Sequence, residues 1–441
     1  MIKRNTATPE NDNAKGTADQ IILGDGCIYS SDSRETGLNN NVLVVGGSGS
    51  GKTVSIAEPL LLQSYSRSII CTVTKRRIVN QYKKLLQSRG YAIWDLDLVH
   101  PAENSNVTYD PLHYIRSYSD ITFLSHSIVK ANPQKQQNSS ADPYWDEAAT
   151  SLMNALIGLV LATNKNATFG DVLELLDTLV FIDDDAGGIQ TTLDRNFEQL
   201  AKQAPKSFAV SNWKSFCKLP IKTAGCVYGT LHATIDSVFT PELRTMFHLN
   251  RPIDFEQMAR KKTALFITSS PVNPSLNCFI SMLYAQLFKS LFEFGEEQPD
   301  GLLPIPVHLL ADDFATGCPV PLFDHYISVF REKRLSVTLL IQSESQLSSL
   351  YGDRSATTII NNCDSYVFMG SNDLLTARNI SFRANRPVED VLHMKLGREI
   401  LFRRGSRPKF VNRYNTYAHP AYRQFIAESA GDIHDSLAKG A

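Results

Sequence analysis

Eight consecutive residues, 46 to 53, carry the clearest chemical signal in the sequence. They read Gly-Gly-Ser-Gly-Ser-Gly-Lys-Thr and fit the GxxxxGK[ST] spacing of a phosphate-binding loop. Glycines let successive backbone N–H groups turn toward phosphate oxygens, and Lys52 supplies a positive charge for the β and γ phosphates. The Thr53 hydroxyl is a magnesium ligand in such loops. The sequence therefore predicts a site for a nucleoside triphosphate with Mg²⁺, formed by Gly46, Ser48, Gly49, Ser50, Gly51, Lys52 and Thr53.

A glycine-rich hairpin or linker is the alternative interpretation of this segment. A linker does not require the lysine and threonine at its end. The segment also follows a β-branched run, 42–45, and precedes a helical pattern, 52–62. This strand-to-helix setting is the one in which the motif is credible, so the sequence favours nucleotide binding.

A phosphate-loop enzyme also needs acids at the end of a neighbouring strand. Residues 307–313 read Val-His-Leu-Leu-Ala-Asp-Asp, an apolar strand pattern that ends in two carboxylates. We expect Asp312 to hold magnesium and Asp313 to orient the attacking water at the carboxyl edge of the sheet. The alternative is that the two aspartates only begin a turn. A similar run, 181–185, lies among helical patterns, and we interpret it as a loop.

The elements that must position these residues alternate between strand and helix. Strand patterns recur between 42 and 96 and again from 263 onward, each followed by a helical pattern, which predicts an α/β fold with parallel pairing. Between 142 and 250 the patterns are mostly helical and indicate an inserted all-α domain. The predicted organisation is a flexible tail (1–20), a nucleotide-binding domain in two parts (21–141 and 251–411, ending in a hairpin), the all-α domain (142–250) and a polar C-terminal tail (412–441).

Composition excludes some functional classes and leaves others open. Lys and Arg number 44 against 45 Asp and Glu, so bulk charge does not indicate nucleic-acid binding, and any such contact must come from local basic clusters. The candidates are 75–77, 260–262 and 403–409, although each is typical of an ordinary solvated surface. No signal peptide or membrane-spanning segment is predicted, and the seven scattered cysteines suit reduced thiols in the cytosol.

Several motifs in a fixed order resemble a known family. Residues 142–149 read Asp-Pro-Tyr-Trp-Asp-Glu-Ala-Ala and residues 309–315 read Leu-Leu-Ala-Asp-Asp-Phe-Ala. With the phosphate loop and the later segments 340–343, 361–364 and 370–373, they resemble the type IV coupling proteins over roughly residues 40–410. These are ring-shaped ATPases that bring DNA and relaxase to conjugative secretion channels.

The resemblance implies a RecA-like nucleotide domain that carries the all-α domain and assembles as a homo-hexamer. It implies ATP and Mg²⁺ as cofactors, with Gln342 near the γ-phosphate. Arg331 would be an arginine finger that reaches a neighbouring subunit's nucleotide, with Arg334 as a substitute. The implied partners are single- or double-stranded DNA bound without sequence preference, a relaxase or other secreted substrate, and components of the type IV secretion channel.

Three departures from the family pattern matter. Asp313 stands where the family has a catalytic glutamate, which makes the acid one methylene shorter. Residues 73–76 read Val-Thr-Lys-Arg in place of the family's Asp-Pro-Lys-Gly, so only Lys75 matches. The family's preceding membrane helices are not predicted here, and we expect a cytoplasmic chain at the inner face of the cell membrane, either without its anchor or held by a separate membrane protein.

The sequence therefore favours a DNA-stimulated motor ATPase acting as a coupling protein. The alternative, motivated by Asp313, is a nucleotide-gated substrate-receptor adaptor with little or no hydrolysis. A chromosome-segregation-type translocase shares the motor core, but the C-terminus shows no recognisable winged-helix module.

Overall fold

The computed structural model describes residues 19–131, 143–183, 189–249, 251–273 and 275–427. A nine-stranded sheet forms its centre, in the order β13-β12-β11-β3-β10-β9-β4-β8-β5. The strands are β3 (Val42–Val45), β4 (Ser68–Val73), β5 (Ala92–Asp97), β8 (Thr263–Thr268), β9 (Val307–Ala311), β10 (Leu335–Ile341), β11 (Ser365–Phe368), β12 (Arg398–Arg403) and β13 (Lys409–Asn412). The seven strands from β11 to β5 run parallel, and the β12–β13 hairpin is added antiparallel at one edge.

Both faces of the sheet are buried, as expected for a parallel sheet with apolar strands. Strand β3 illustrates the alternation, because Val42 and Val44 belong to one buried cluster whereas Leu43 and Val45 belong to the other. The first cluster includes α2 (Glu58–Leu62) and α3 (Arg76–Ser88). The second includes α13 (Ser275–Glu296), α14 (Phe323–Val329), α15 (Glu344–Tyr351), α16 (Asp353–Asn361) and α17 (Leu374–Ala384).

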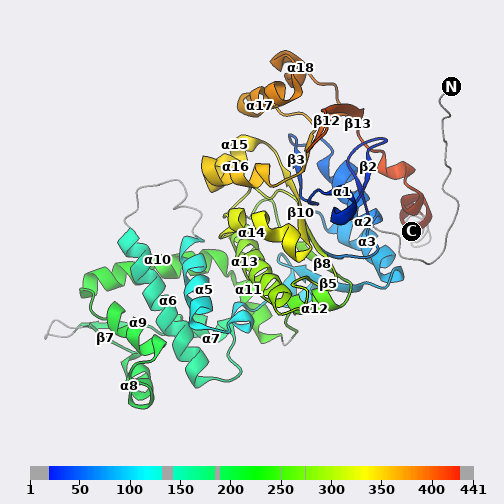
Figure 1. Cartoon of the computed structure of the whole chain (residues 1–441). Helices are drawn as coiled ribbons and strands as arrows, with labels where there is room; N and C mark the ends of the chain where they lie inside the picture. The colour runs from blue at the N-terminus through cyan, green and yellow to red at the C-terminus, as the bar shows by residue number, and fades with distance from the viewer. Residues whose placement is uncertain (1–18, 132–142, 184–188, 250, 274, 428–441) are drawn as a thin grey trace, which may run out of the picture.

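A helical segment is inserted between β5 and β8 and lies to one side of the sheet (Figure 1). Its main helices are α5 (Tyr118–Lys130), α6 (Pro143–Thr163), α7 (Phe169–Asp177), α8 (Asp194–Gln203), α9 (Phe208–Phe216) and α10 (Ile221–Val238). Helix α6 is central and packs against α5 and α9. The predicted α/β fold with a helical insertion is confirmed.

Shorter elements complete the chain. They are β1 (Gln20–Ile22), β2 (Ile28–Ser30), α1 (Ser33–Thr36), η1 (Thr53–Ala57), α4 (Pro101–Asn104), η2 (Pro111–Tyr114), β6 (Phe181–Asp183), β7 (Ile189–Thr191), α11 (Pro241–Arg244), η4 (Thr245–His248), α12 (Phe255–Arg260), η5 (Phe330–Lys333), α18 (Val388–Leu392), η6 (Thr416–Ala418) and η7 (Tyr422–Ala427). Across the described ranges, no helix has the length and apolar character needed to span a membrane.

Three local expectations were wrong. Residues Phe181–Asp183 form strand β6, which pairs antiparallel with β7, because an aromatic and β-branched run extends readily even among helices. Cys278 and Cys318 form a disulfide and are not reduced thiols, since α13 and the loop after β9 bring their Cα atoms to 4.8 Å. The segment after 412 is not only a polar tail, because Thr416, His419 and Ala421 are buried against the core.

Candidate nucleotide site

The phosphate-binding loop leaves the centre of the sheet at the carboxyl end of β3. Its first amides are fixed by the two flanking strands, because Gly46 N donates to Ile341 O at 3.1 Å and Gly47 N donates to Gly370 O at 2.8 Å. Ile341 is the last residue of β10, and Gly370 follows the end of β11. The start of the loop is therefore held by neighbours that are distant in sequence, and the rest of the loop turns from that anchor.

The loop curls as phosphate binding requires. Gly49 and Gly51 adopt φ angles of 72° and 86°, which side chains with a Cβ rarely tolerate. The hydroxyl of Ser50 is buried in the loop and has no hydrogen-bond partner. An unsatisfied buried hydroxyl is costly, and a phosphate oxygen is a partner that would satisfy it. The loop therefore fits the anion that its sequence predicts.

Lys52 reaches back over the loop from the helical end. Its ammonium donates to the carbonyl of Gly46, and to that of Gly47 at 3.2 Å. Burial lowers the pKa of Lys52, whereas the charges of Asp313 and Asp312 raise it. The cation is thus enclosed by the loop and balanced by the acidic pair.

Thr53 joins the loop to the first acid. It opens η1, a π-helical turn that continues into α2. Its Oγ1 donates to Asp312 Oδ2 at 3.0 Å. Burial and the charge of Asp313 raise the pKa of Asp312, while the Thr53 hydrogen bond and Lys52 lower it. A hydroxyl beside one carboxylate is the protein contribution that Mg²⁺ takes when it is also bound to phosphates and water, so this donor pair fits the predicted metal.

Asp313 lies in the turn that follows β9. Its φ of 52° is left-handed, a conformation that aspartate tolerates better than most residues. Thr316 Oγ1 donates to its carbonyl at 2.7 Å, and Thr316 accepts from Asn277 Nδ2 at 3.0 Å. Ser281 and the Cys278–Cys318 disulfide hold the far end of the same turn to α13. The second acid therefore sits on a turn secured by one helix.

Gln342 and Arg331 lie at opposite ends of β10. Gln342 follows Ile341, whose carbonyl binds Gly46, so the structure brings an exposed glutamine beside the phosphate loop. Arg331 is in η5, immediately before the strand starts. Seven strand residues separate them, which corresponds to roughly 20 Å. The structure therefore does not bring Arg331 to its own chain's phosphate loop.

The surroundings of Arg331 carry charges of both signs. The side chain is exposed and lines a cavity of about 380 Å³ with Arg34, Arg67 and Arg334 and with two aspartates, Asp19 and Asp32. Arg334 is engaged with its own chain, because its Nη1 donates to Leu303 O and Pro304 O, both at 3.1 Å. Of the two arginines that the resemblance singles out, Arg331 is the one whose side chain is not held by such bonds in the described residues.

Several arginines of the three basic clusters are ion-paired or stacked on a ring within the chain. Arg76 makes a bidentate pair with Asp95 at 2.6 and 2.7 Å, and Arg77 pairs with Glu58 at 2.9 Å. Arg260 pairs with Glu256 at 3.0 Å. Arg403 lies over the ring of Tyr29, and Arg404 forms an ion pair with Asp364. These contacts favour a structural role for the named arginines.

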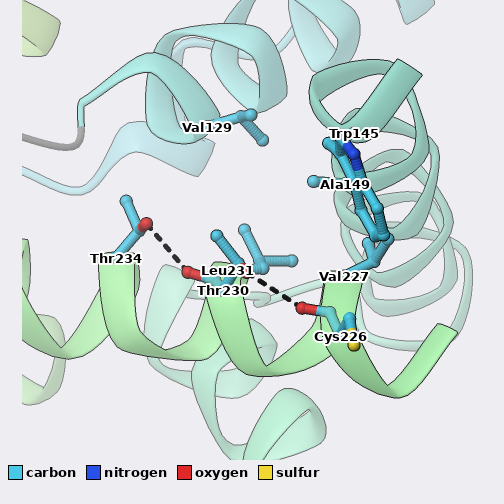
Figure 2. A pocket seen from close by; sticks show the side chains of 8 residues that line it. All are labelled: Val129, Trp145, Ala149, Cys226, Val227, Thr230, Leu231 and Thr234. Atoms are coloured by element: carbon cyan, nitrogen blue, oxygen red, sulfur yellow. Dashed lines mark hydrogen bonds between the residues drawn. The ribbon is translucent and has the colours of Figure 1, made fainter. Parts of the chain in front are cut away.

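Of the motif at 142–149, Asp142 lies outside the described residues, and Trp145 and Ala149 line an apolar cavity of the helical segment, of about 250 Å³ (Figure 2). Trp145 of α6 lies at the rim of the cavity, over α10, and is 40% exposed. The cavity is lined by Val129, Trp145, Ala149, Cys226, Val227, Thr230, Leu231 and Thr234. Two hydroxyls on α10 are bonded within the helix, Thr230 to Cys226 O and Thr234 to Thr230 O, both at 2.9 Å. The cavity therefore presents a largely apolar lining.

Sequence reasoning missed two contacts of the phosphate loop. The carbonyl of Gly370 accepts from Gly47, and the guanidinium of Arg413 lies against Gly51. Gly370 stood in a segment quoted for the family resemblance, whereas Arg413 fell in the segment interpreted as a tail. No local pattern around Arg413 could have indicated this contact, because the β12–β13 hairpin creates it.

Comparisons with known proteins were made for the sequence and for the fold. The family model described as type IV secretory system conjugative DNA transfer matches residues 1–384. No curated protein sequence matches the chain.

Solved structures that are similar in fold include the following three. The bacterial conjugative coupling protein TrwBdeltaN70 in complex with sulphate is 16% identical, with a TM-score of 0.65 over 91% of this chain and 90% of that one. The plasmid coupling protein TrwB in complex with ADP and Mg²⁺ gives the same identity, TM-score and shares. VirB4 of Thermoanaerobacter pseudethanolicus is 13% identical, with a TM-score of 0.54 over 95% of this chain and 100% of that one.

Proposed function

The chain belongs to the type IV secretory system conjugative DNA transfer family, and from that membership we propose that it is a Mg²⁺-dependent coupling ATPase. In this role it would use ATP hydrolysis to recruit a DNA–relaxase substrate and drive it into the secretion channel. The observation that carries the proposal is the convergence of Lys52, Thr53 and Asp312 at one edge of the sheet. The solved complex of the structurally similar protein TrwB with ADP and Mg²⁺ supports the choice of ligand.

Each residue has a role that follows from its position. The loop amides and the Ser50 hydroxyl bind phosphate oxygens, and Lys52 neutralises the β and γ phosphates. Thr53 and Asp312 hold the magnesium that accompanies the nucleotide. Asp313 and Gln342, on the ends of neighbouring strands, orient water toward the γ-phosphate. Bound Mg-ATP supplies the phosphoryl group, whose developing charge these residues stabilise.

The catalytic arginine comes from a second copy of the chain in this proposal. Arg331 lies at the amino edge of the sheet and the phosphate loop lies at the carboxyl edge. When unlike surfaces of identical copies meet and the rotation closes, a ring results. A homo-hexamer that places Arg331 of one copy at the nucleotide of the next would complete the site, because a guanidinium stabilises charge on the transferred phosphoryl group.

The partners follow from the proposed role. A motor must pass over any sequence, so it contacts the phosphates of single- or double-stranded DNA and not base edges. The helical segment, which lies apart from the nucleotide site, would receive the relaxase or another secreted substrate (Figure 1). We place the chain at the cytoplasmic face of the cell membrane beside the secretion channel, through an anchor of its own or a separate membrane protein.

A nucleotide-gated receptor adaptor is the second candidate, favoured by one observation. Asp313 is one methylene shorter than the glutamate of the family motif, and a shorter acid holds water less close to the γ-phosphate. Such an adaptor binds ATP tightly, turns over slowly and retains its cargo. It shares every other feature of the site.

Steady-state phosphate release separates the two functions. The native chain is compared with Lys52→Ala, with and without single-stranded DNA, at concentrations where rings form. Release that depends on Lys52 and rises with DNA supports the motor. Nucleotide binding without release under these conditions would instead support the adaptor.

A further inference from the structure

The C-terminal segment returns from the sheet edge to the phosphate loop. It leaves β13 at Asn412, and the amide of Arg413 donates to Gly397 O at 2.9 Å. Beyond it, Thr416 Oγ1 donates to the carbonyl of Val54 in η1, and His419 bonds Gln63 at 2.9 Å. The segment is therefore fixed to the helical turn that follows the loop.

These contacts place the Arg413 guanidinium against the end of the loop. A methyl group added to Gly51 would lie 3.2 Å from Arg413 Nη1 and 3.6 Å from Ser55 Oγ. Arg413 Nη2 donates to Met369 O at 3.3 Å, while its Nε is buried without a hydrogen-bond partner. The Arg413 guanidinium therefore lies close against Gly51, which brings a cation to the junction of loop and helix.

The Arg413 charge has no close counterion. No carboxylate in the described ranges lies within ion-pairing distance of it. The charge of Glu399 in β12 raises the pKa of Arg413. Glu399 is fully buried, and its two carboxylate oxygens lack hydrogen-bond partners. A partly buried guanidinium without a paired carboxylate, next to an anion-binding loop, is available for an anion.

Two cations therefore stand at the two ends of the loop. Lys52 Nζ bonds the carbonyls of Gly46 and Gly47, where the loop begins, whereas Arg413 lies at Gly51 and Ser55, where it becomes helix. Phosphate loops hold the β and γ phosphates at the lysine and the α-phosphate along the backbone amides. The end of the loop at Gly51, away from the Lys52 ammonium group, therefore faces the α-phosphate side of a bound nucleotide.

We propose that Arg413 is a nucleotide-binding residue that contacts the α-phosphate side of the bound nucleoside di- or triphosphate. The assignment rests on the proposed nucleotide site, and it adds a residue that the family match, which ends at residue 384, does not include. Since ADP and ATP share the α-phosphate, Arg413 contributes to binding both equally. Its contribution is to affinity and not to the chemical step.

Two substitutions separate a ligand contact from a structural one. Arg413→Gln keeps a donor for Met369 O but removes the charge, and Arg413→Lys keeps the charge. Affinities are measured with a fluorescent ADP analogue and Mg²⁺, and by competition with ADP and with a non-hydrolysable ATP analogue. Thermal unfolding midpoints are recorded for each chain.

We expect Arg413→Gln to weaken ADP and the ATP analogue by about the same factor, of order tenfold, and Arg413→Lys to stay within about threefold of the native chain. A glutamine variant that binds ADP as the native chain does would overturn the assignment and leave the proposed function standing. A glutamine variant whose unfolding midpoint falls sharply would also overturn it, since Arg413 would then serve the hairpin. If the native chain binds neither nucleotide, the result would instead contradict the proposed ATPase function itself.

Discussion

The hydroxyl of Thr53 and the carboxylate of Asp312, 3.0 Å apart, join the ends of two strands that are not neighbours in the sheet. Strand β10 lies between β3 and β9, so the bond crosses one strand position at the carboxyl edge. Asp312→Asn removes the negative charge that a magnesium ion requires. We expect kcat for phosphate release to fall by about 100-fold or more, and the magnesium concentration for half-maximal rate to rise.

The matched control for this substitution is Asp300→Asn, at an exposed loop aspartate on the amino side of the sheet, where the carbonyl of the adjacent Gly301 accepts from Lys333 of η5. Its rate is expected to equal that of the native chain. Equal rates of phosphate release for Asp312→Asn and Asp300→Asn would show that Asp312 does not bind the magnesium ion.

Asp313 gives a prediction of a different kind, because its backbone is left-handed. Asp313→Asn keeps that conformation and removes the base, so we expect nucleotide binding to persist while hydrolysis falls by about 100-fold. Asp313→Glu restores the longer acid at a backbone cost of roughly 1 kcal/mol, and we expect faster phosphate release than in the native chain. Single-turnover release and nucleotide titration on the same three proteins check both results, and an unchanged rate in the glutamate variant would favour the adaptor.

Glu399 predicts a pH-dependent stability. Burial raises its pKa to about 8 from 4.5, although Arg413 lowers it. The folded chain therefore binds a proton that the unfolded chain releases, and stability falls as pH rises from about 4.5 to about 8. Glu399→Gln mimics the protonated acid, so its free energy of unfolding relative to the native chain should rise by a few kcal/mol between pH 5 and pH 8.5.

Denaturant unfolding at the two pH values tests this, with the exposed Glu389→Gln as control. The native-minus-variant difference cancels other titrating groups. A difference that does not change with pH would mean that Glu399 ionises normally in the folded chain.

Gly158 lies at a close contact between α6 and α9. A Cβ at this position would lie 2.9 Å from the Cβ of Ala209, closer than two carbon atoms can sit without movement. Gly158→Val is expected to destabilise the chain by about 1–3 kcal/mol through overpacking. Gly229→Ala, in α10 with nothing within 4 Å of its added Cβ, should instead stabilise by about 0.5–1 kcal/mol. Urea unfolding of both variants measures the contrast, and similar effects of the two would contradict close packing at Gly158.

The parts of the site that could be predicted from sequence are those built from one continuous segment. The strand, loop and helix around Lys52 follow one another directly in the sequence. The apolar run before Asp312 shows that this acid lies at the carboxyl end of its strand. Because parallel strands end at a common edge, the two segments could be placed together before their contact was known.

The remaining parts depend on pairings that no local pattern encodes. Arg413 reaches Gly51 only after β12 and β13 have added to the sheet, and Cys278 meets Cys318 only when α13 packs beside the turn after β9. The strand at Phe181 was misread because its acidic end and helical surroundings outweighed three residues of extended pattern. Long-range packing decides each of these cases.

The adjacency of β5 and β8 has a kinetic consequence. The two strands pair residue for residue, yet residues 98–262 separate them in the chain. Closing so long a loop costs entropy that a short connection does not, unless the intervening chain is already compact. We therefore expect the helical segment to fold before β8 joins the sheet, so that this edge forms late and sets the slow phase of refolding.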